Sequence, residues 1–345
     1  MKHSKGDLQQ MQSLPLSAKI IMTQQRIKAW YEHWDGEVYV SFSGGKDSTV
    51  LLHLAREIYP DIEAVFVNTG LEYPEIQQFV KTFENVTILR PEMRFDEVIK
   101  KYGYPIISKE TSENIFIARK NPLSRCATKF DENSEYVKKY GTQYCLSKWK
   151  PILDSDIPIS HMCCNVMKKK PAKEFEKRTG KKPILATMAS ESKLREKMWV
   201  QNGCNGFDMK RPTSNPMAFW TEQDVLQYIK EKNLPIASVY GEITYADNPD
   251  QMRLEDFGFD YGGGKLCTTG CNRTGCIFCG FGCHLDKSPS RFERLKETHP
   301  KQYTYCIGGG EYNENGVWQP NNQGLGLGKV FEELNELLGD GFIKY

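Results

Sequence analysis

Short apolar runs alternate with helical patterns through the first ninety residues of the chain. Residues 38–42, 64–68 and 86–89 are rich in β-branched and aromatic side chains, which is typical of buried strands. Helical patterns lie between them, after Ser48 and over residues 75–83. Strands that alternate with helices form βαβ units. We therefore predict an α/β fold, with a doubly wound, mainly parallel sheet and flanking helices.

Helical spacing of apolar residues predicts further elements. Residues 17–34 place Ile27 and Trp30 on one face, so an amphipathic helix leads into the first strand. Thr221 is a suitable N-cap for a helix over residues 220–233, whose first turn is acidic. The remaining predicted elements are helices at residues 173–177 and 330–338 and a buried strand at residues 183–188.

The pattern is weaker in two regions. Residues 92–160 contain helical pieces and turns, and from residue 241 onward glycine, asparagine and cysteine dominate. The second composition is typical of a loop-rich region that is held together by something other than a large apolar core. We therefore divide the chain into a helical lead-in at residues 1–36, an α/β domain at residues 37–240, and a cysteine-rich region with C-terminal helices at residues 241–345.

The composition is that of a soluble globular protein. Of the 345 residues, 39% are apolar and 12% aromatic, and no stretch approaches the roughly 20 apolar residues that a membrane span needs. The first residues, MKHSKGDLQQMQ, lack the apolar core of a secretory signal, so we expect a cytoplasmic protein without a membrane partner. Lys and Arg number 46 against 44 Asp and Glu, a net charge of +2. A nucleic acid would therefore have to be bound by a local patch.

A glycine loop, SFSGGKDST at residues 41–49, joins the first predicted strand to the helix after it. Its two glycines let the backbone approach an anion, Lys46 adds a positive charge, and the helix directs its N-terminal dipole at the same point. Val40 stands where a Walker A loop needs a glycine, and Asp47 directly follows the lysine, so the loop is not that motif. The pattern favours a phosphate cradle over a plain glycine turn with an incidental lysine.

Eleven cysteines are the most informative part of the composition. In a reducing compartment, a surplus of cysteine points to metal or redox chemistry rather than to disulfides. Two are adjacent, Cys163 and Cys164, and five fall within 17 positions: Cys267, Cys271, Cys276, Cys279 and Cys283. The CxxxC and CxxC spacings of the second group could supply four sulfurs to one zinc ion. His284 is a further candidate ligand.

The loop SGGKDS resembles the pyrophosphate-binding loop of the adenine nucleotide alpha hydrolase superfamily, the PP-loop ATP pyrophosphatases. Within it, the chain is most similar to the phosphoadenosine phosphosulfate (PAPS) reductase family. The similarity covers about residues 38–283 and continues in NTGLEYPE (68–75), YPIISKE (104–110), CCNVMKKKP (163–171), ATMASESKLR (186–195) and NPMAFWTEQDVLQYI (215–229). It implies that an adenine nucleotide binds to the domain at residues 37–240. The residues implied around its phosphates are Ser43, Gly44, Gly45, Lys46, Asp47 and Ser48, and those implied at the adenosine pocket are Asn68, Thr69 and Gly70.

The resemblance also implies an iron–sulfur cluster. Cys163, Cys164, Cys276 and Cys279 match the CC and CxxC pattern by which adenylylsulfate-type reductases hold a [4Fe-4S] cluster, and four thiolates fit such a cluster. We favour the cluster over Zn²⁺, which remains the alternative in its place or beside it. The other cysteines of the crowded segment would then form a second metal site or carry sulfur as working thiols.

Basic residues near these motifs are candidates for binding anions. Between residues 161 and 182, eight basic residues stand against two acidic ones. Lys168 and its neighbours would neutralise a polyanionic substrate or the cluster, although a solvated helix face explains such a run equally well. After Lys46, Arg195 is the second candidate for binding an anion, and Arg211 and Arg273 are weaker ones.

One feature of the sulfonucleotide reductases is missing. Those enzymes carry their catalytic cysteine in a C-terminal Glu-Cys-Gly-Leu-His type motif, whereas this chain ends in GDGFIKY and its last cysteine, Cys306, lies in TYCIGGG. Other members of the superfamily spend ATP, with Mg²⁺, to adenylate an oxygen and release pyrophosphate before sulfur displaces AMP.

Three functions follow as hypotheses. We favour an ATP pyrophosphatase that supports thiolation of an acceptor such as a nucleic acid, with Lys46, Asp47 and Arg195 as catalytic residues and a sulfur-donor or electron-donor protein as partner. The second is a sulfonucleotide reductase with an atypical thiol. The third is a non-catalytic nucleotide-binding subunit.

Overall fold

The computed structural model describes residues 3–246 and 264–345, and the chain folds into two compact units. Unit 1 comprises Met1–Asn68, Glu72–Leu89 and Ala172–Thr274, and unit 2 comprises Thr69–Leu71, Arg90–Pro171 and Gly275–Tyr345. The boundaries predicted at residues 36 and 240 do not coincide with these units, because Ile27 and Trp30 of the lead-in helix belong to the core of unit 1. Residues 247–263 of the predicted loop-rich region lie outside the described residues.

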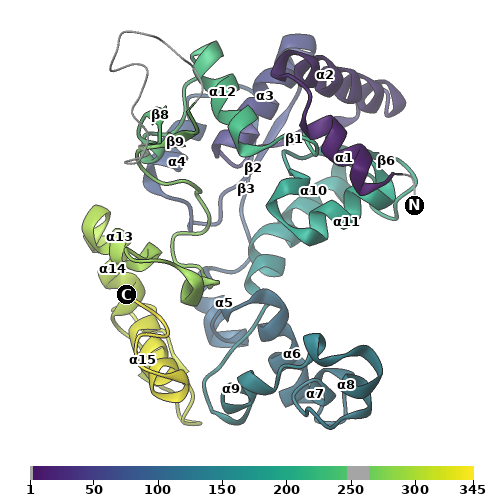
Figure 1. The fold of residues 1–345 in the computed structure, drawn as a ribbon. Coiled ribbons are helices and arrows are strands. Elements are labelled where there is room, and N and C mark those ends of the chain that lie inside the picture. Colours follow the sequence, from purple (N-terminus) through teal and green to yellow (C-terminus); the bar gives the residue numbers. More distant parts are fainter. Residues whose placement is uncertain (1–2, 247–263) are drawn as a thin grey trace. The chain divides into compact units, whose positions relative to one another are not determined.

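Unit 1 is built on a six-stranded sheet with the strand order β3-β2-β1-β5-β7-β6. The strands are β1 (Val38–Ser41), β2 (Ala64–Val67), β3 (Val86–Leu89), β5 (Lys182–Ile184), β6 (Asn205–Gly206) and β7 (Thr213–Ser214). Only the β6–β7 pair is antiparallel, which confirms the predicted doubly wound, mainly parallel sheet (Figure 1). The strand order reverses between β1 and β5, and ligands of such sheets bind at this switch point, beyond the carboxyl ends of the strands.

The side chains of β1 and β2 alternate between two cores, so helices cover both faces of the sheet. Val38 and Val40 belong to the larger core, together with residues of α2, α3 and α12, whereas Tyr39 and Val65 pack against Phe175 of α10. The helices concerned are α1 (Lys5–Gln12), α2 (Leu16–His33), α3 (Lys46–Ile58), α4 (Pro74–Val80), α10 (Lys170–Thr179), α11 (Lys193–Asn202) and α12 (Glu222–Lys232). A small hairpin of β8 (Ile243–Tyr245) and β9 (Leu266–Thr268) completes unit 1.

The predicted helix after Thr221 is α12, and its first turn is fixed from two sides. The Asp224 N–H donates to Thr221 Oγ1 at 3.4 Å and the Thr221 N–H donates to the Asp224 carboxylate at 2.7 Å, which forms a capping box. The same carboxylate accepts hydrogen bonds from buried Lys19 at 2.7 and 2.8 Å. The start of α12, where Glu222 lies, is thereby tied to α2.

Unit 2 is mainly helical (Figure 1). Its helices are α5 (Phe95–Tyr102), α6 (Lys109–Lys120), α7 (Arg125–Thr128), α8 (Glu135–Tyr140), α9 (Lys150–Asp154), α13 (Arg291–Thr298), α14 (Pro300–Ile307) and α15 (Leu327–Leu338), and its strands are β4 (Ile106–Ile107), β10 (Gly280–Phe281), β11 (Glu311–Tyr312) and β12 (Trp318–Gln319). The predicted C-terminal helices lie beyond residue 290, where Phe292, Val330 and Phe331 are fully buried. No helix in the described part of the chain has both the length and the apolarity to cross a bilayer.

Candidate functional site

The glycine loop follows β1 directly and so lies at the switch point of the sheet. Gly44 has a φ of +72°, and a Cβ there would lie 2.7 Å from a methyl of Val80 and 2.8 Å from one of Ile76. Only glycine fits this close approach of the loop to α4. Gly45 is the N-cap of α3 and provides no side-chain cap. The N–H groups of the first turn therefore take their partners from elsewhere.

Ser48 closes the loop from within. Its hydroxyl donates to the Gly45 carbonyl at 2.9 Å, accepts from the Ser43 N–H at 3.1 Å and lies 3.0 Å from Ser43 Oγ. The side chain is buried. Ser48 thus maintains the shape of the loop, while the resemblance implied only that it lies near the phosphates.

Lys46 is 3% exposed, and oxygen atoms surround both of its nitrogens. Nζ donates to the Asn272 carbonyl at 2.9 Å and lies 3.2 Å from Glu222 Oε1 and 3.6 Å from Asp47 Oδ1. The backbone N–H donates to the Tyr240 hydroxyl at 3.1 Å. Sequence reasoning identified Lys46 but not these partners, because Tyr240 is 194 positions away and no short motif marks it.

Asp47, whose side chain is 29% exposed, brings a partly buried carboxylate to the same loop. Its Oδ1 atom has no hydrogen-bond partner among the residues that the structure describes. Burial raises the pKa of Asp47, and the charges of Lys46 and Arg273 oppose this shift. Mg²⁺ takes oxygen ligands and is usually bound by one or two carboxylates together with substrate phosphates. A buried carboxylate oxygen beside the glycine loop fits such an ion.

Arg195 and Arg273 share one carboxylate near the loop. Both guanidinium groups pair with Glu191, that of Arg273 at 3.8 Å. The pKa of Arg195 is lowered first by burial and then by the charge of Arg273, while Asp47 opposes the shift. The structure therefore brings Arg195, Arg273 and Asp47 within electrostatic range of one another, as a second cluster of charge beside Lys46.

The other basic candidates of unit 1 have structural partners. Arg211 donates to both carboxylate oxygens of Glu176, at 2.8 and 2.5 Å, and the Tyr39 hydroxyl donates to the same group at 2.8 Å. Lys181 donates to Glu63 at 2.7 Å. These residues hold the sheet and α10 together, so we do not assign an anion to Arg211.

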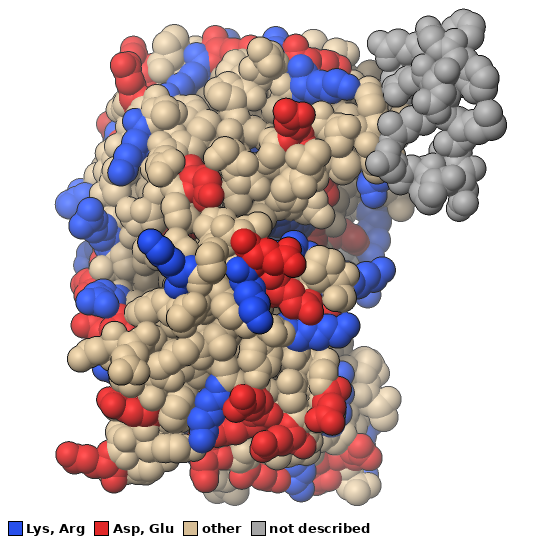
Figure 2. All heavy atoms as spheres, turned by 90° about the vertical axis from the view of Figure 1, so that its left-hand side faces the viewer, with Lys and Arg blue, Asp and Glu red and all other residues tan. Residues whose placement is uncertain are grey.

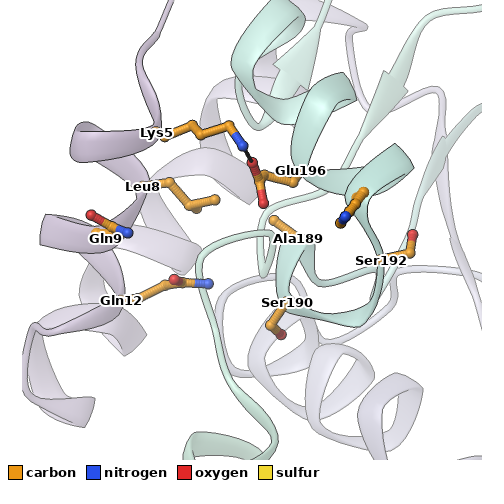
Figure 3. A pocket seen from close by; sticks show the side chains of 9 residues that line it. Lys5, Leu8, Gln9, Gln12, Ala189, Ser190, Ser192 and Glu196 are labelled. Atoms are coloured by element: carbon orange, nitrogen blue, oxygen red, sulfur yellow. Dashed lines mark ion pairs between the residues drawn. The ribbon is translucent and has the colours of Figure 1, made fainter. Parts of the chain in front are cut away.

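A polar cavity of about 460 Å³ lies between α1 and residues 189–196 (Figure 3). Ser190 and Ser192, from the segment ATMASESKLR, line it opposite Gln9 and Gln12. The residues of the glycine loop do not line this cavity. Ser192 Oγ accepts a hydrogen bond from the Arg195 N–H at 3.3 Å, while the Arg195 guanidinium pairs with Glu191.

Acidic and basic side chains are interspersed over the face drawn in Figure 2. This distribution agrees with the small net charge of +2. Attraction of an anion therefore depends on local groups such as those around Lys46.

The residues predicted at the adenosine pocket are divided between the units. Asn68 belongs to unit 1, whereas Thr69 and Gly70 belong to unit 2. The Leu71 N–H donates to Thr69 Oγ1 at 3.2 Å, and the Leu71 carbonyl accepts from the Ile277 N–H at 2.7 Å. This short segment is thus attached to the CxxC loop.

Residues 104–107, which the apolar pattern did not resolve, organise the cysteine site of unit 2. Tyr104 exchanges backbone hydrogen bonds with residues 158–160, at 2.7 and 3.0 Å. The next residues form β4, which pairs in parallel with β10, so that Ile106 lies opposite Gly280. A Cβ at Gly280 would lie 2.7 Å from the Ile106 side chain. This segment therefore joins the chain before the adjacent cysteine pair to the chain after the CxxC pair.

All four cysteines predicted as cluster ligands lie in unit 2. Cys163 Sγ is 3.9 Å from Cys164 Sγ. The pKa of Cys163 is raised, mainly by its hydrogen bond to Cys164 and by burial, and further by the charges of Cys279 and Cys276. The two pairs are thus close enough to influence one another's ionisation.

Lysines favour a thiolate at Cys164. Its pKa is lowered to about 6, first because the Cys163 thiol donates a hydrogen bond to it and then because of the charges of Lys109, Lys168 and Lys169. Thiolates are the form in which cysteine binds iron. The part of the basic run next to the cysteine pair therefore acts on this site.

The crowded cysteine segment is split between the units. Cys267 and Cys271 belong to unit 1, and Cys276, Cys279 and Cys283 to unit 2. Within residues 3–246 and 264–345, no three His, Cys, Asp or Glu side chains converge as ligands of a single metal ion. In a [4Fe-4S] cluster each thiolate binds a different iron. Four thiols in two pairs, beside three lysines, are a donor set that fits such a cluster.

Arg291 braces the CxxC loop and was not found from the sequence. Its Nη1 donates to the carbonyls of Cys279 and Phe281 at 3.1 and 2.9 Å, while Nε and Nη2 donate to the Asp286 carboxylate at 2.7 and 2.9 Å. An arginine with five donors can satisfy all of these oxygens at once. The pair therefore fixes the backbone that carries Cys279.

Two further thiols of unit 2, those of Cys283 and Cys306, are buried, whereas Cys126 and Cys145 are partly exposed. Cys306 is fully buried, and burial raises its pKa. Burial also raises the pKa of Cys283, to about 12. Neutral buried thiols are poor nucleophiles. His284 stacks on Phe342 at 5.1 Å, and its Nδ1 has no hydrogen-bond partner in the described part of the chain.

The model of the phosphoadenosine phosphosulfate reductase domain matches residues 37–132 and 125–280. The chain belongs to the PAPS reductase family. An uncharacterised protein of Methanocaldococcus jannaschii is 34% identical over 128 residues, which are 35% of this chain and 28% of that protein. The adenosine 5'-phosphosulfate reductase of Staphylococcus epidermidis is 23% identical over 167 residues, which are 39% of this chain and 69% of that enzyme.

A solved PAPS reductase from Candida auris, a phosphate complex, aligns with a TM-score of 0.37 at 13% identity, over 80% of this chain and 99% of that one. The chain spans 28% and 18% of the lengths of two M. jannaschii relatives. The PAPS reductase family membership expected from the motifs is thus confirmed by the domain match over residues 37–280.

Proposed function

We propose that this member of the PAPS reductase family is an ATP pyrophosphatase that adenylates an acceptor oxygen and thereby supports thiolation of the acceptor, for which a nucleic acid is the class we favour. The observation that carries the proposal is Asp47. A buried carboxylate oxygen without a hydrogen-bond donor, next to a glycine loop and Lys46, suits a magnesium nucleotide.

The residues of unit 1 have definite roles in this reaction. The acceptor oxygen forms a bond to the α-phosphorus of ATP, the bond from that phosphorus to its bridging oxygen breaks, and pyrophosphate leaves with the electron pair. Lys46 and the loop N–H groups stabilise the charge on the departing pyrophosphate. Asp47 would hold Mg²⁺, and Arg195, together with Arg273, adds positive charge at the same loop. A sulfide-level sulfur nucleophile from the donor protein then forms a bond to the acceptor carbon, the bond from that carbon to the adenylated oxygen breaks, and AMP leaves with the electron pair.

In unit 2, we propose that Cys163, Cys164, Cys276 and Cys279 bind a [4Fe-4S] cluster. The lysines beside Cys164 would balance its negative charge, and Arg291 would hold the backbone of Cys279. When bound, the cluster would supply redox or sulfur-binding chemistry. Zn²⁺ is the alternative occupant.

A sulfonucleotide reductase is the second candidate, because curated relatives in Staphylococcus and Serratia are named as such reductases. That reaction needs a nucleophilic thiol. Cys306 is fully buried with a raised pKa, so it does not suit this role and we place the reductase second. A nucleotide-binding subunit without turnover is the third candidate.

Product analysis separates the candidates. We expect the purified chain to release pyrophosphate from ATP with Mg²⁺ in the presence of acceptor, and Lys46→Ala to lower the rate by about 10²-fold or more, because it removes charge stabilisation of the leaving group. Lys28→Ala, on the exposed face of α2, is the matched control and should keep the wild-type rate.

Unchanged kinetics in Lys46→Ala would remove the phosphate assignment. Thiol-dependent sulfite from an adenylyl sulfate that is lost in Cys306→Ser would move the chain to the reductases. Nucleotide binding without either product would support the third candidate.

A further inference from the structure

Two oxygen atoms of the chain occupy the donors of Lys46. The Tyr240 hydroxyl accepts from the Lys46 N–H at 3.1 Å, and the Asn272 carbonyl accepts from Lys46 Nζ at 2.9 Å. In the proposed function, these are the donors that would meet phosphoryl oxygens. We use the term strap for residues 272–274 together with Tyr240.

The strap lies directly over the glycine loop. Tyr240 Oη and Thr274 Oγ1 are 2.6 Å apart. A Cβ built on Gly45 would lie 3.2 Å from the first oxygen and 3.4 Å from the second. Two hydroxyl groups thus cover the middle of the loop, at the position where a phosphate would approach the backbone.

The hydroxyl of Tyr240 can make both contacts at once. Burial raises the pKa of Tyr240, so the hydroxyl keeps its proton at neutral pH. Its oxygen accepts from Lys46 while its proton is available to Thr274. Loss of either partner would leave a buried polar group less well satisfied.

Different contacts anchor the base of the strap. The Gly270 N–H donates to the Tyr240 carbonyl and the Cys271 N–H to the Val239 carbonyl, both at 2.9 Å. A Cβ at Gly270 would lie 2.4 Å from the Val239 carbonyl oxygen. Backbone pairing therefore fixes residues 270–271, whereas residues 272–274 reach the glycine loop through an exchangeable carbonyl and hydroxyl.

We propose that the strap is an autoinhibitory contact, a proposal that rests on the function proposed above. The Tyr240 hydroxyl and the Asn272 carbonyl take the places of two phosphoryl oxygens, and both leave Lys46 before a polyphosphate binds. The apparent affinity for phosphate is then the intrinsic affinity reduced by the fraction of molecules in which the strap is open. Weakening the strap increases this fraction.

Calorimetric titration of the full chain with inorganic pyrophosphate and Mg²⁺ tests the proposal. We expect Tyr240→Phe to bind pyrophosphate about fivefold more tightly than wild type, because one hydrogen bond that competes with the ligand is gone. Thr274→Val should shift the affinity in the same direction by a smaller factor, and it serves as the second variant if Tyr240→Phe folds poorly.

Tyr228→Phe is the matched control. It removes another buried tyrosine hydroxyl of unit 1, which lies 2.9 Å from His53 Nδ1 and does not touch the strap, so its affinity should equal that of wild type. Unchanged or weaker binding by both strap variants would overturn the proposal, since the hydroxyls would then be neutral or would bind the ligand themselves.

Lys46→Ala distinguishes this failure from failure of the proposed function. If wild type binds pyrophosphate and Lys46→Ala does not, the phosphate assignment stands, and only the strap variants decide the autoinhibition. If Lys46→Ala binds as well as wild type, the loop is not the phosphate site, and the strap proposal is overturned with it.

Discussion

Individual charged side chains shape both candidate sites: Lys46 and Asp47 lie in the glycine loop of unit 1, and Arg291 holds the CxxC loop of unit 2. Lys46 and Asp47 could be predicted because they belong to one short motif. Their partners could not, since Asn272 lies 226 positions from Lys46 and reaches it only through the fold. The same limit applies to Arg291 in unit 2, whose role depends on the carbonyls of Cys279 and Phe281.

The ion pair of Asp286 and Arg291 gives a prediction at the scale of the residue. Burial would raise the pKa of Asp286, but hydrogen bonds and charge from Arg291 outweigh it and lower the pKa. The carboxylate therefore stabilises the fold at neutral pH, and this contribution is lost as the pH falls through the lowered folded-state pKa. We expect Asp286→Asn to reduce the free energy of unfolding at pH 7 by about 2 kcal/mol.

Urea unfolding between pH 7 and about pH 2.5 measures this effect, because the folded-state pKa of Asp286 lies below its ordinary value of 3.8. The difference between wild type and Asp286→Asn should shrink toward the acid end. Asp96→Asn removes a more exposed pair with Arg94 and is expected to change little at any pH. A difference for Asp286→Asn that stays constant with pH would rule out the linkage.

Among the elements, those with a long periodic pattern were predicted and those that depend on partners were not. α2, α3, α12 and the first three strands lie where the apolar pattern places them. β4 has only two residues and exists because it pairs with β10 and follows Tyr104, which bonds to residues 158–160. C-terminal helices were predicted, but the positions of α13 and α14 were not, because the glycine and cysteine content before them dominated the interpretation of that region.

The contact of the glycine loop with α4 gives a prediction at the scale of the element. Gly44 and Gly180 both have a positive φ, of +72° and +78°. Gly44→Ala would place a Cβ against Ile76 and Val80, whereas a Cβ at Gly180 would have open space around it. We expect Gly180→Ala to lower the free energy of unfolding by about 1 kcal/mol, because of backbone strain alone. Gly44→Ala should lower it by about 1–3 kcal/mol more, because the added methyl group overpacks the contact with α4.

Denaturant unfolding of the two alanine variants provides the comparison. Gly44→Ala should also weaken pyrophosphate binding, because α4 then displaces the loop. An equal loss in the free energy of unfolding in the two variants would show that the loop does not depend on close packing against α4.

At the scale of the whole molecule, each unit holds one of the two candidate sites. The glycine loop with Lys46 belongs to unit 1, and the four candidate cluster ligands belong to unit 2. The motifs predicted both sites, but the sequence could not reveal that the cysteine-rich segment is divided after Thr274. That division follows from which residues pack together, which spacing alone does not encode.

Iron content tests the assignment of unit 2. Protein purified without oxygen should be brown, with about four iron atoms per chain. Cys279→Ser should lose most of this iron, while Cys126→Ser, outside both cysteine pairs, should keep it. Colourless protein that contains zinc would refute the cluster.

Removal of the iron should act locally. Since the four candidate cluster ligands lie beside β4 and β10, chelation should increase hydrogen exchange at residues 159–167 and 276–283 and leave β1 and β2 unchanged. Increased hydrogen exchange in β1 and β2 as well would contradict the expectation that loss of iron affects unit 2 alone.

The strand order of unit 1 has a consequence for synthesis on the ribosome. β1 and β2 emerge early, but β5, which pairs with the other edge of β1, begins only at Lys182, after residues 90–171 of unit 2 have been made. Throughout that interval, one edge of β1 has unmatched backbone groups that can recruit a foreign strand. Nascent chains therefore expose a site for misassociation at the strand that leads into the glycine loop.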